Sequence, residues 1–169
     1  MARKRAGAEA GTPALRVLQE AGVAHTAHPY EHTGGETRFG DEAVRGLREA
    51  GVDATPERVL KTLLADVDGR LVVAVVPVAA SLDLKALAAA AGGRRAAMAD
   101  PARAQRSSGY VLGGISPLGQ RTPLPTVVEA AALAWPTVLV SAGRRGLQVE
   151  LSPTDLVRLT GAATAAVAR

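Results

Sequence analysis

Two apolar runs separated by a short polar segment constrain the fold of this chain more than any other feature. The runs cover residues 59–65 and 71–78, and residues 67–70 lie between them. An Asp-Gly pair such as Asp68-Gly69 favours the positive φ angles of a two-residue turn between antiparallel strands. We therefore expect the fold to be built around an antiparallel hairpin of aliphatic strands.

Helix and strand signals alternate along the rest of the sequence. Capping residues followed by proline or by alanine-rich segments predict helices at 12–22, 41–50 and 81–91, and helices that start at 100 and 152. Strands are predicted at 23–30 and 94–99, and a second hairpin joins 137–140 to 147–151. Hairpins interleaved with helices predict an α+β domain with a mixed, largely antiparallel sheet and helices packed around it.

Length and composition limit the class of protein. At 169 residues the chain is most simply one domain over 12–169, after a flexible N-terminal tail over 1–11. No apolar run reaches the ~18 residues of a membrane span, and the first residues lack the apolar stretch of a secretory signal. The absence of cysteine excludes disulfides and thiolate ligands and suits a reducing compartment, so we expect a cytoplasmic protein without membrane contact.

The positive charge of the chain has two interpretations. The net charge is +4, and much of the excess lies in pairs such as Arg94-Arg95 and Arg144-Arg145. Such pairs can contact a phosphate backbone, but they are equally typical of a solvated surface. Because aromatic residues make up only 2% of the chain, a base-stacking platform is not expected.

The glycine-rich segment 108–119 is the second unusual feature. Its glycines, its low charge and Pro117 disfavour a helix. The segment is either a tight connection between buried elements or a loop whose bare backbone lines a pocket for a small polar ligand.

Lys61 stands inside the first apolar run of the central hairpin. Only three of the 20 basic residues are lysines, and Lys61 and Lys85 are the two outside the N-terminal segment. Lys61 has two interpretations: burial lowers its pKa and suits it to hold an anionic or carbonyl oxygen, or it protects a solvent-facing edge strand.

Other residues offer weaker signals for chemistry. All three histidines, His25, His28 and His32, fall within eight residues, but they lack the further ligands of a zinc site, so no metal is expected. Ser116 does not fit the nucleophile elbow of hydrolases, because Leu118 stands where the second glycine belongs. The residues therefore indicate no protein nucleophile.

Six motifs in the same order resemble the YbaK/EbsC family of free-standing aminoacyl-tRNA deacylases, which is related to the editing domain of bacterial prolyl-tRNA synthetases. The resemblance extends over about 12–167 and is closest to the branch that clears Cys-tRNA(Pro). The motifs are His28-Pro29-Tyr30-Glu31-His32, Glu36-Thr37-Arg38-Phe39-Gly40, Val59-Leu60-Lys61-Thr62-Leu63, Leu82-Asp83-Leu84-Lys85, residues 108–119, and Val140-Ser141-Ala142-Gly143-Arg144-Arg145-Gly146.

The resemblance implies a set of site residues. Lys61 matches a lysine that contacts the terminal nucleotide or ester oxygens, and Gly113 matches a glycine whose backbone positions the α-amino group. With Tyr30 these form the expected catalytic set. The expected substrate-binding residues are Phe39, Thr62, Gly114, Ser116, Ser141 and Gln148.

Two positions depart from the family pattern. Gln148 stands where close relatives carry Asp. The glutamine side chain keeps an acceptor oxygen but lacks the negative charge of aspartate. Ala142 stands where glycine is usual.

The function that the resemblance implies is trans-editing of Cys-tRNA(Pro), and of Cys-tRNA(Cys) as a further substrate, at the tRNA 3′ end. The thiol of the substrate would attack its own ester, without metal or cofactor, and prolyl-tRNA synthetase is an expected partner. Two alternatives stay open from the sequence. One is an Ala-tRNA(Pro) deacylase that uses water, and the other is a non-catalytic module that binds tRNA or a small ligand.

Overall fold

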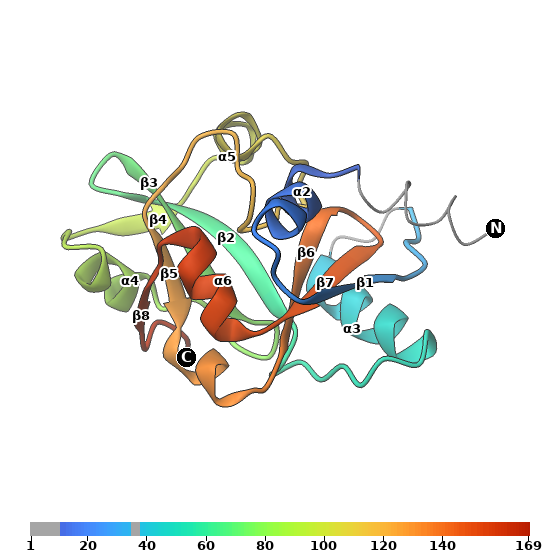
Figure 1. Cartoon of the computed structure of the whole chain (residues 1–169). Coiled ribbons are helices and arrows are strands. Elements are labelled where there is room, and N and C mark those ends of the chain that lie inside the picture. The colour runs from blue at the N-terminus through green and yellow to red at the C-terminus, as the bar shows by residue number, and fades with distance from the viewer. Residues whose placement is uncertain (1–10, 35–37) are drawn as a thin grey trace.

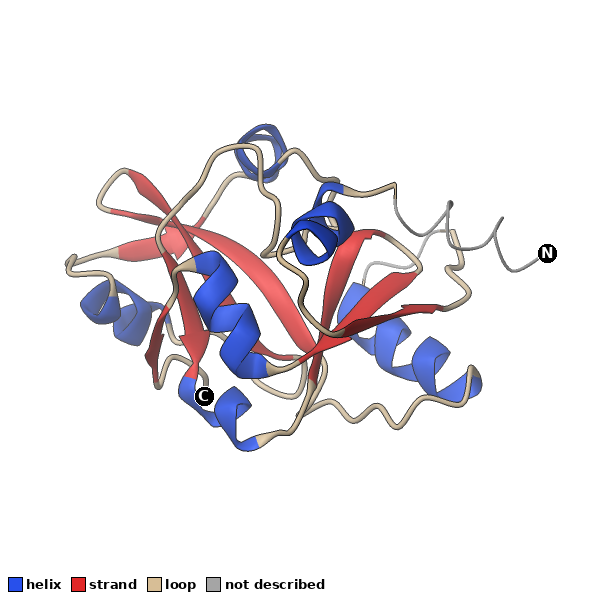
Figure 2. Cartoon of the chain, in the orientation of Figure 1, coloured by secondary structure: helices blue, strands red, loops and turns tan. Residues whose placement is uncertain are grey.

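The structure is a computed structural model that describes residues 11–34 and 38–169. Most of the predicted tail, together with Glu36 and Thr37 of the second motif, lies outside the described residues. The described chain folds into two sheets with helices packed around them (Figure 1 and Figure 2).

The larger sheet is built on the central hairpin. Strands β2 (Leu60–Val67) and β3 (Arg70–Pro77) pair antiparallel along their whole length. Strand β4 (Ala96–Met98) lies antiparallel against the other edge of β2, and β5 (Thr126–Glu129) and β8 (Ala163–Ala165) continue the sheet in parallel beyond β3.

The turn of this hairpin confirms the prediction from Asp68-Gly69. Both residues have positive φ angles, 51° at Asp68 and 90° at Gly69, as a type I′ turn requires. The Asp66 carboxylate also accepts a hydrogen bond from the Gly69 N–H at 2.7 Å.

The smaller sheet is antiparallel and contains the second predicted hairpin. Its strand order is β1 (His25–Pro29), β7 (Leu147–Leu151) and β6 (Val138–Arg144). A parallel bridge between Val59 and Leu139 connects it to the start of β2. The predicted α+β class with mixed, mostly antiparallel pairing is confirmed, although the strands divide between two sheets.

The helices begin largely where capping residues predict them. The side chains of Thr12, Asp83, Asp100 and Ser152 accept backbone hydrogen bonds at helix N-termini. The helices are α2 (Pro13–Glu20), α3 (Phe39–Glu49), α4 (Leu84–Ala90), α5 (Pro101–Ser108), α6 (Pro153–Thr160) and the short 3₁₀ helix η1 (Ala130–Ala134). None of the described helices is long and apolar enough to span a bilayer.

Several boundaries differ from the sequence expectations. Helix α4 begins at Leu84, three residues late, because the N–H groups of Ser81 and Asp83 bond instead to Arg169 and Val167 near the C-terminus. Helix α3 begins at Phe39, two residues early. Strands β5 and β8 were not predicted, since each is short and forms only through long-range pairing.

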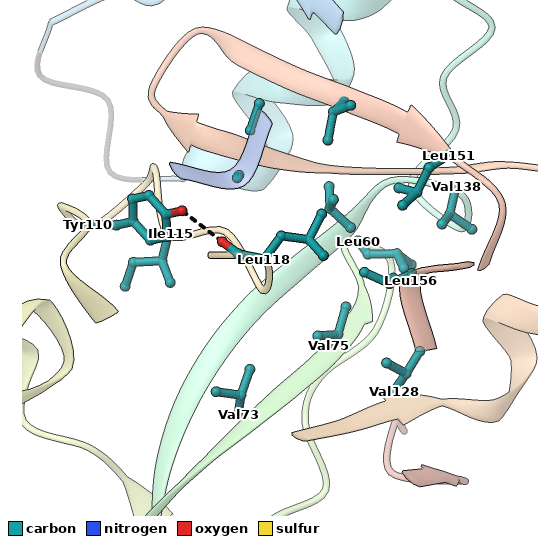
Figure 3. Close-up of a cluster of buried hydrophobic side chains, with 14 of the residues drawn as sticks. Leu60, Val73, Val75, Tyr110, Ile115, Leu118, Val128, Val138, Leu151 and Leu156 are labelled. Atoms are coloured by element: carbon teal, nitrogen blue, oxygen red, sulfur yellow. Dashed lines mark hydrogen bonds between the residues drawn. The ribbon is translucent and has the colours of Figure 1, made fainter. Parts of the chain in front are cut away.

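The main hydrophobic core joins the two sheets, and aliphatic side chains fill it. It includes Leu60, Val75, Val128, Val138 and Leu156 (Figure 3). The glycine-rich loop is anchored in this core by Tyr110, whose hydroxyl donates to the Leu118 carbonyl at 2.7 Å. Burial raises the pKa of Tyr110 to about 12, so this hydroxyl keeps its proton across the physiological range.

Candidate active site

A cavity of about 440 Å³ opens where α3, the start of β2, the glycine-rich loop and the β6–β7 pair meet. The volume falls within the ~300–1,000 Å³ typical of small-molecule sites. The described residues that line it are Arg38, Phe39, Gly40, Asp41, Ala43, Val59, Leu60, Lys61, Thr62, Leu63, Val78, Leu112, Gly113, Ile115, Ser141 and Gln148.

Lys61 enters this cavity from β2, where it pairs with Val76 of β3. Burial lowers the pKa of its ammonium, and the nearby Asp41 carboxylate partly offsets this shift by raising it. Among the described residues, Lys61 forms no hydrogen bond or ion pair. The lysine is therefore a partly desolvated cation whose donors are available to an oxygen of a ligand.

Gly113 brings bare backbone to the cavity, and its conformation requires glycine. Its φ angle is +82°, and a Cβ at this position would lie 2.5 Å from Cδ1 of Phe39. The aromatic ring of Phe39, the first residue of α3, thus packs directly on the Gly113 peptide. Any side chain at 113 would displace the ring or the loop.

Arg145 holds three parts of the site together from the β6–β7 turn. Its Nε donates to the Leu112 carbonyl at 2.7 Å. Its guanidinium carbon lies 4.7 Å from the centre of the Phe39 ring, which is within the range of a cation–π contact. One side chain therefore links the turn, the glycine-rich loop and the start of α3.

Two buried acceptor atoms of the cavity lack a hydrogen-bond partner. Within the described part of the chain, five buried polar side-chain atoms are unpaired, and Oγ1 of Thr62 and Oε1 of Gln148 are the two whose residues line this cavity. Unpaired buried polar atoms are rare in folded proteins because each costs ~1–3 kcal/mol. These two oxygens are suited to receive the N–H or O–H donors of a ligand.

Of the remaining predicted site residues, Ser141 lines the cavity and Tyr30, Gly114 and Ser116 lie behind the lining. Ser141 accepts the Gly143 N–H at 3.2 Å. Tyr30 is not among the lining residues; burial raises the pKa of its hydroxyl, and a hydrogen bond with the Gln148 side chain opposes that rise. Tyr30 thus reaches the cavity only through its contact with Gln148.

Gly114 and Ser116 support the loop instead of facing the cavity. A Cβ on Gly114 would lie 2.8 Å from Cα of Arg144, so this glycine allows close packing of the loop on β6. Ser116 is fully buried, and its hydroxyl accepts the Leu118 N–H at 3.2 Å.

The three histidines point to separate partners. His25 contacts the Val23 carbonyl at 2.7 Å. Nε2 of His28 lies 2.8 Å from the Glu150 carboxylate, and Nδ1 of His32 lies 2.6 Å from that of Glu42. The described residues contain no group of three side chains placed to hold a metal ion.

The model of the aminoacyl-tRNA editing domain family matches residues 41–159. The chain belongs to this family. The editing-domain match covers α3 from its third residue onward, the central hairpin, the glycine-rich loop and the β6–β7 pair, which are the elements that enclose the cavity. The family acts on aminoacyl-tRNA, and this defines the general class of substrate.

Relatives of the editing domain extend the similarity over nearly the whole chain. A protein of Enterococcus faecalis named "Putative Cys-tRNA(Pro)/Cys-tRNA(Cys) deacylase EbsC" is 33% identical over 162 residues, which are 95% of this chain and 93% of that protein. A crystal structure of "a putative trans-editing enzyme for prolyl tRNA synthetase" superposes with a TM-score of 0.74 at 25% identity, covering 94% of this chain and 98% of that one. The crystal structure of hypothetical protein APE2540 shares the fold, with a TM-score of 0.80 at 24% identity and coverage of 94% and 100%.

Asp41 and Leu112 are among the lining residues that the sequence did not assign to the site. Asp41 follows the Phe39-Gly40 pair, and its position in the sequence indicates only an acidic residue in the first turn of a helix. Leu112 contributes its carbonyl to Arg145, which a side-chain motif cannot indicate. Both roles depend on contacts between segments that are distant in the sequence.

Proposed function

We propose that this editing domain is a trans-acting deacylase that cleaves the aminoacyl ester of Cys-tRNA(Pro), with Cys-tRNA(Cys) as a further substrate. The observation that carries the proposal is the partly desolvated, unpaired ammonium of Lys61 in a cavity that also holds two unpaired acceptor oxygens. The name of the Enterococcus faecalis relative, a putative Cys-tRNA(Pro)/Cys-tRNA(Cys) deacylase, supports the choice of amino acid and tRNA.

Each polar group of the cavity receives a role in this proposal. The Lys61 ammonium binds ester or terminal-ribose oxygens, where negative charge develops as the ester breaks. The Gly113 backbone positions the α-amino group of the substrate, while Oε1 of Gln148 and Oγ1 of Thr62 accept its N–H donors or a ribose hydroxyl. Phe39 and Ser141 form walls that limit the size of the aminoacyl side chain.

The chemical step that we propose uses the substrate as its own nucleophile. The thiol sulfur of the cysteinyl group attacks the ester carbonyl carbon, a C–S bond forms, and the C–O bond to the ribose breaks. The thiol proton is transferred to the leaving ribose oxygen, so that the products are a cyclic cysteine thioester and a tRNA with a free hydroxyl. The protein contributes orientation and charge stabilisation, which suits a site without a protein nucleophile.

A panel of charged tRNAs tests this mechanism. We expect Cys-tRNA(Pro) to be deacylated at least ~100-fold faster than Ser-tRNA(Pro), because a hydroxyl attacks poorly without an activating base whereas a thiol is intrinsically nucleophilic. Ala-tRNA(Pro), which has no nucleophile on its side chain, should be cleaved no faster than Ser-tRNA(Pro). Loss of labelled amino acid from each tRNA measures the rates.

Equal rates for the cysteine and serine substrates would contradict attack by the substrate thiol and would indicate bound water as the nucleophile. Preference for the alanine substrate would instead assign the protein to Ala-tRNA(Pro). Binding of every charged tRNA without cleavage would contradict the deacylase proposal as a whole.

Gln148 provides a second test of the assigned roles. Replacing Gln148 with leucine removes the acceptor oxygen but keeps similar bulk, so we expect KM to rise about tenfold, as for loss of one hydrogen bond of ~1.5 kcal/mol to a charged group. Tyr30→Phe removes the hydroxyl that contacts Gln148 and leaves the acceptor in place, so it measures the support that Tyr30 gives to Gln148 separately from the acceptor itself. An unchanged KM in Gln148→Leu would remove Gln148 from substrate binding.

Association with prolyl-tRNA synthetase is a further part of this proposal. It is supported by the solved relative described as "a putative trans-editing enzyme for prolyl tRNA synthetase". Co-purification of the two proteins at low ionic strength in the presence of tRNA(Pro) is the expected result, and failure to co-purify under those conditions would contradict it.

A further inference from the structure

A second hollow lies at the opposite end of β2 from the cavity. It is lined by Asp66, Asp68, Lys85, Arg94, Arg95 and two alanines of β4. In Figure 1 the tip of the β2–β3 hairpin and α4 lie at one end of the molecule, while α3 and β1 lie at the other. The hollow is therefore separate from the site described above.

The loop that carries Arg94 and Arg95 is fixed by its backbone. The Asp68 carboxylate accepts the N–H groups of both arginines, at 2.8 and 3.0 Å, and the Asp68 N–H donates to the Arg95 carbonyl at 3.0 Å. Gly93 is required for this packing, because a Cβ there would lie 2.5 Å from Cγ1 of Val67 and 2.8 Å from an Asp68 oxygen. The loop thus holds two adjacent arginines in a defined place.

The side chains of these arginines are left available to a ligand. Arg94, Arg95 and Lys85 are exposed, and within the described chain none of the three side chains forms an ion pair. Both carboxylates of the hollow have partners: Asp68 binds two backbone N–H groups and also attracts the charges of Arg94 and Arg70, and Asp66 pairs with Arg103 at 2.5 Å. Exposed Arg70 adds a further cation next to Asp68.

The arginine loop and Lys61 lie at the two ends of one face of β2, and α4 covers that face between them. Side chains alternate along a strand, so Lys61, Leu63, Ala65 and Val67 share one face, and the arginine loop packs on Val67. Six residues of strand at ~3.3 Å each place the loop about 20 Å from Lys61. That distance corresponds to roughly six stacked nucleotides at ~3.4 Å per nucleotide.

We propose that Arg94 and Arg95, together with Lys85 and Arg70, bind the phosphates of the tRNA acceptor arm while the aminoacylated 3′ end occupies the cavity. This inference rests on the proposed function. Phosphate contacts position a nucleic acid without reading its sequence, so the surface would strengthen binding to every tRNA and would leave the choice of amino acid to the cavity.

The test compares a full tRNA with a short substrate that cannot reach the surface. In Arg94→Ala/Arg95→Ala we expect KM for Cys-tRNA(Pro) to rise about tenfold with kcat unchanged, and the salt dependence of binding to weaken by about 0.7–0.9 per lost phosphate contact. With a cysteinylated CCA trinucleotide the same variant should match the wild type. The arginines are exposed, so circular dichroism should show an intact fold.

Arg16→Ala/Arg158→Ala is the matched control, because it removes the same charge from exposed positions on α2 and α6. A KM change of the same size in both double variants would overturn the proposal, as would a change that also appears with the trinucleotide.

If the wild type cleaves neither substrate, the proposed function fails. Filter binding of uncharged tRNA then tests the basic surface independently of catalysis. Equal affinity of the two double variants for uncharged tRNA would overturn the proposed binding surface.

Discussion

Replacing Lys61 with alanine is expected to lower the deacylation rate by about 10²- to 10³-fold, the usual effect of removing one preorganised charge or donor from a transition state. The ammonium lines the cavity and has no ion pair among the described residues, so its loss removes an available positive charge from the site. Single-turnover deacylation of Cys-tRNA(Pro) at saturating enzyme measures the chemical step without a contribution from binding.

The fold of the Lys61→Ala variant is expected to survive. Burial lowers the pKa of Lys61, which means that the folded environment disfavours the charged form. Removing the side chain therefore takes away a desolvation cost, and thermal unfolding should occur at or above the wild-type temperature. Near wild-type turnover in this variant would contradict the role of Lys61. If Lys61→Ala does not fold, the same activity measurement on Lys61→Met tests that role.

The lowered pKa of Lys61 also predicts the alkaline limb of the pH profile. Only the protonated amine stabilises negative charge, so activity should decline as pH rises through a pKa below the ordinary lysine value. The effect on stability has the opposite sign, because the unfolded chain binds the proton more tightly and the folded state gains stability as pH rises through the same range. Arginine stays charged over this pH range. The activity that the Lys61→Arg variant retains should therefore not decline at alkaline pH.

The second large effect is expected for Gly113→Ala, with a loss of deacylation of about 100-fold or more. The added methyl group would lie 2.5 Å from the Phe39 ring at a φ angle of +82°. The loop or the ring must move, and misplacement of a substrate-positioning peptide by ~1 Å is sufficient for a loss of that size. Deacylation kinetics and thermal unfolding should be measured on the same preparation.

Gly51→Ala separates local strain from the effect on the site. Gly51 ends α3 with a φ of +86°, and no atom lies within 4 Å of a Cβ built there. This control should lose stability by ~1–2 kcal/mol, the penalty for a left-handed conformation, and should keep full activity. Equal activity in Gly113→Ala and Gly51→Ala would contradict a role for the Gly113 peptide in positioning the substrate.

Local signals in the sequence predicted most of the elements near the site. The Asp68-Gly69 turn, the two hairpins and the proline-started helices depend on neighbouring residues alone, so their patterns are visible in one sequence. Strand β5 shows the limit of such signals. It is four residues long, fully buried and paired in parallel on both sides, and nothing within those four residues indicates this.

The same division applies to the candidate site. The family resemblance picked Lys61, Phe39, Thr62, Gly113, Ser141 and Gln148, and all of them line one cavity, although their roles stay predictions. The sequence could not separate these residues from Gly114 and Ser116, whose contacts support the loop. It also could not indicate that Arg145 joins the Leu112 carbonyl to the Phe39 ring.

The sequence by itself determined the class of fold, the central hairpin and the family, because turn chemistry, capping and ordered motifs are properties of adjacent residues. Only the tertiary structure decided whether Lys61 faces solvent or a cavity, since alternation along β2 allows either. It also decided which acceptors are left unpaired and where the second basic surface lies relative to the first site. Desolvation and the pairing of charges depend on which distant segments pack together, and no local pattern specifies that packing.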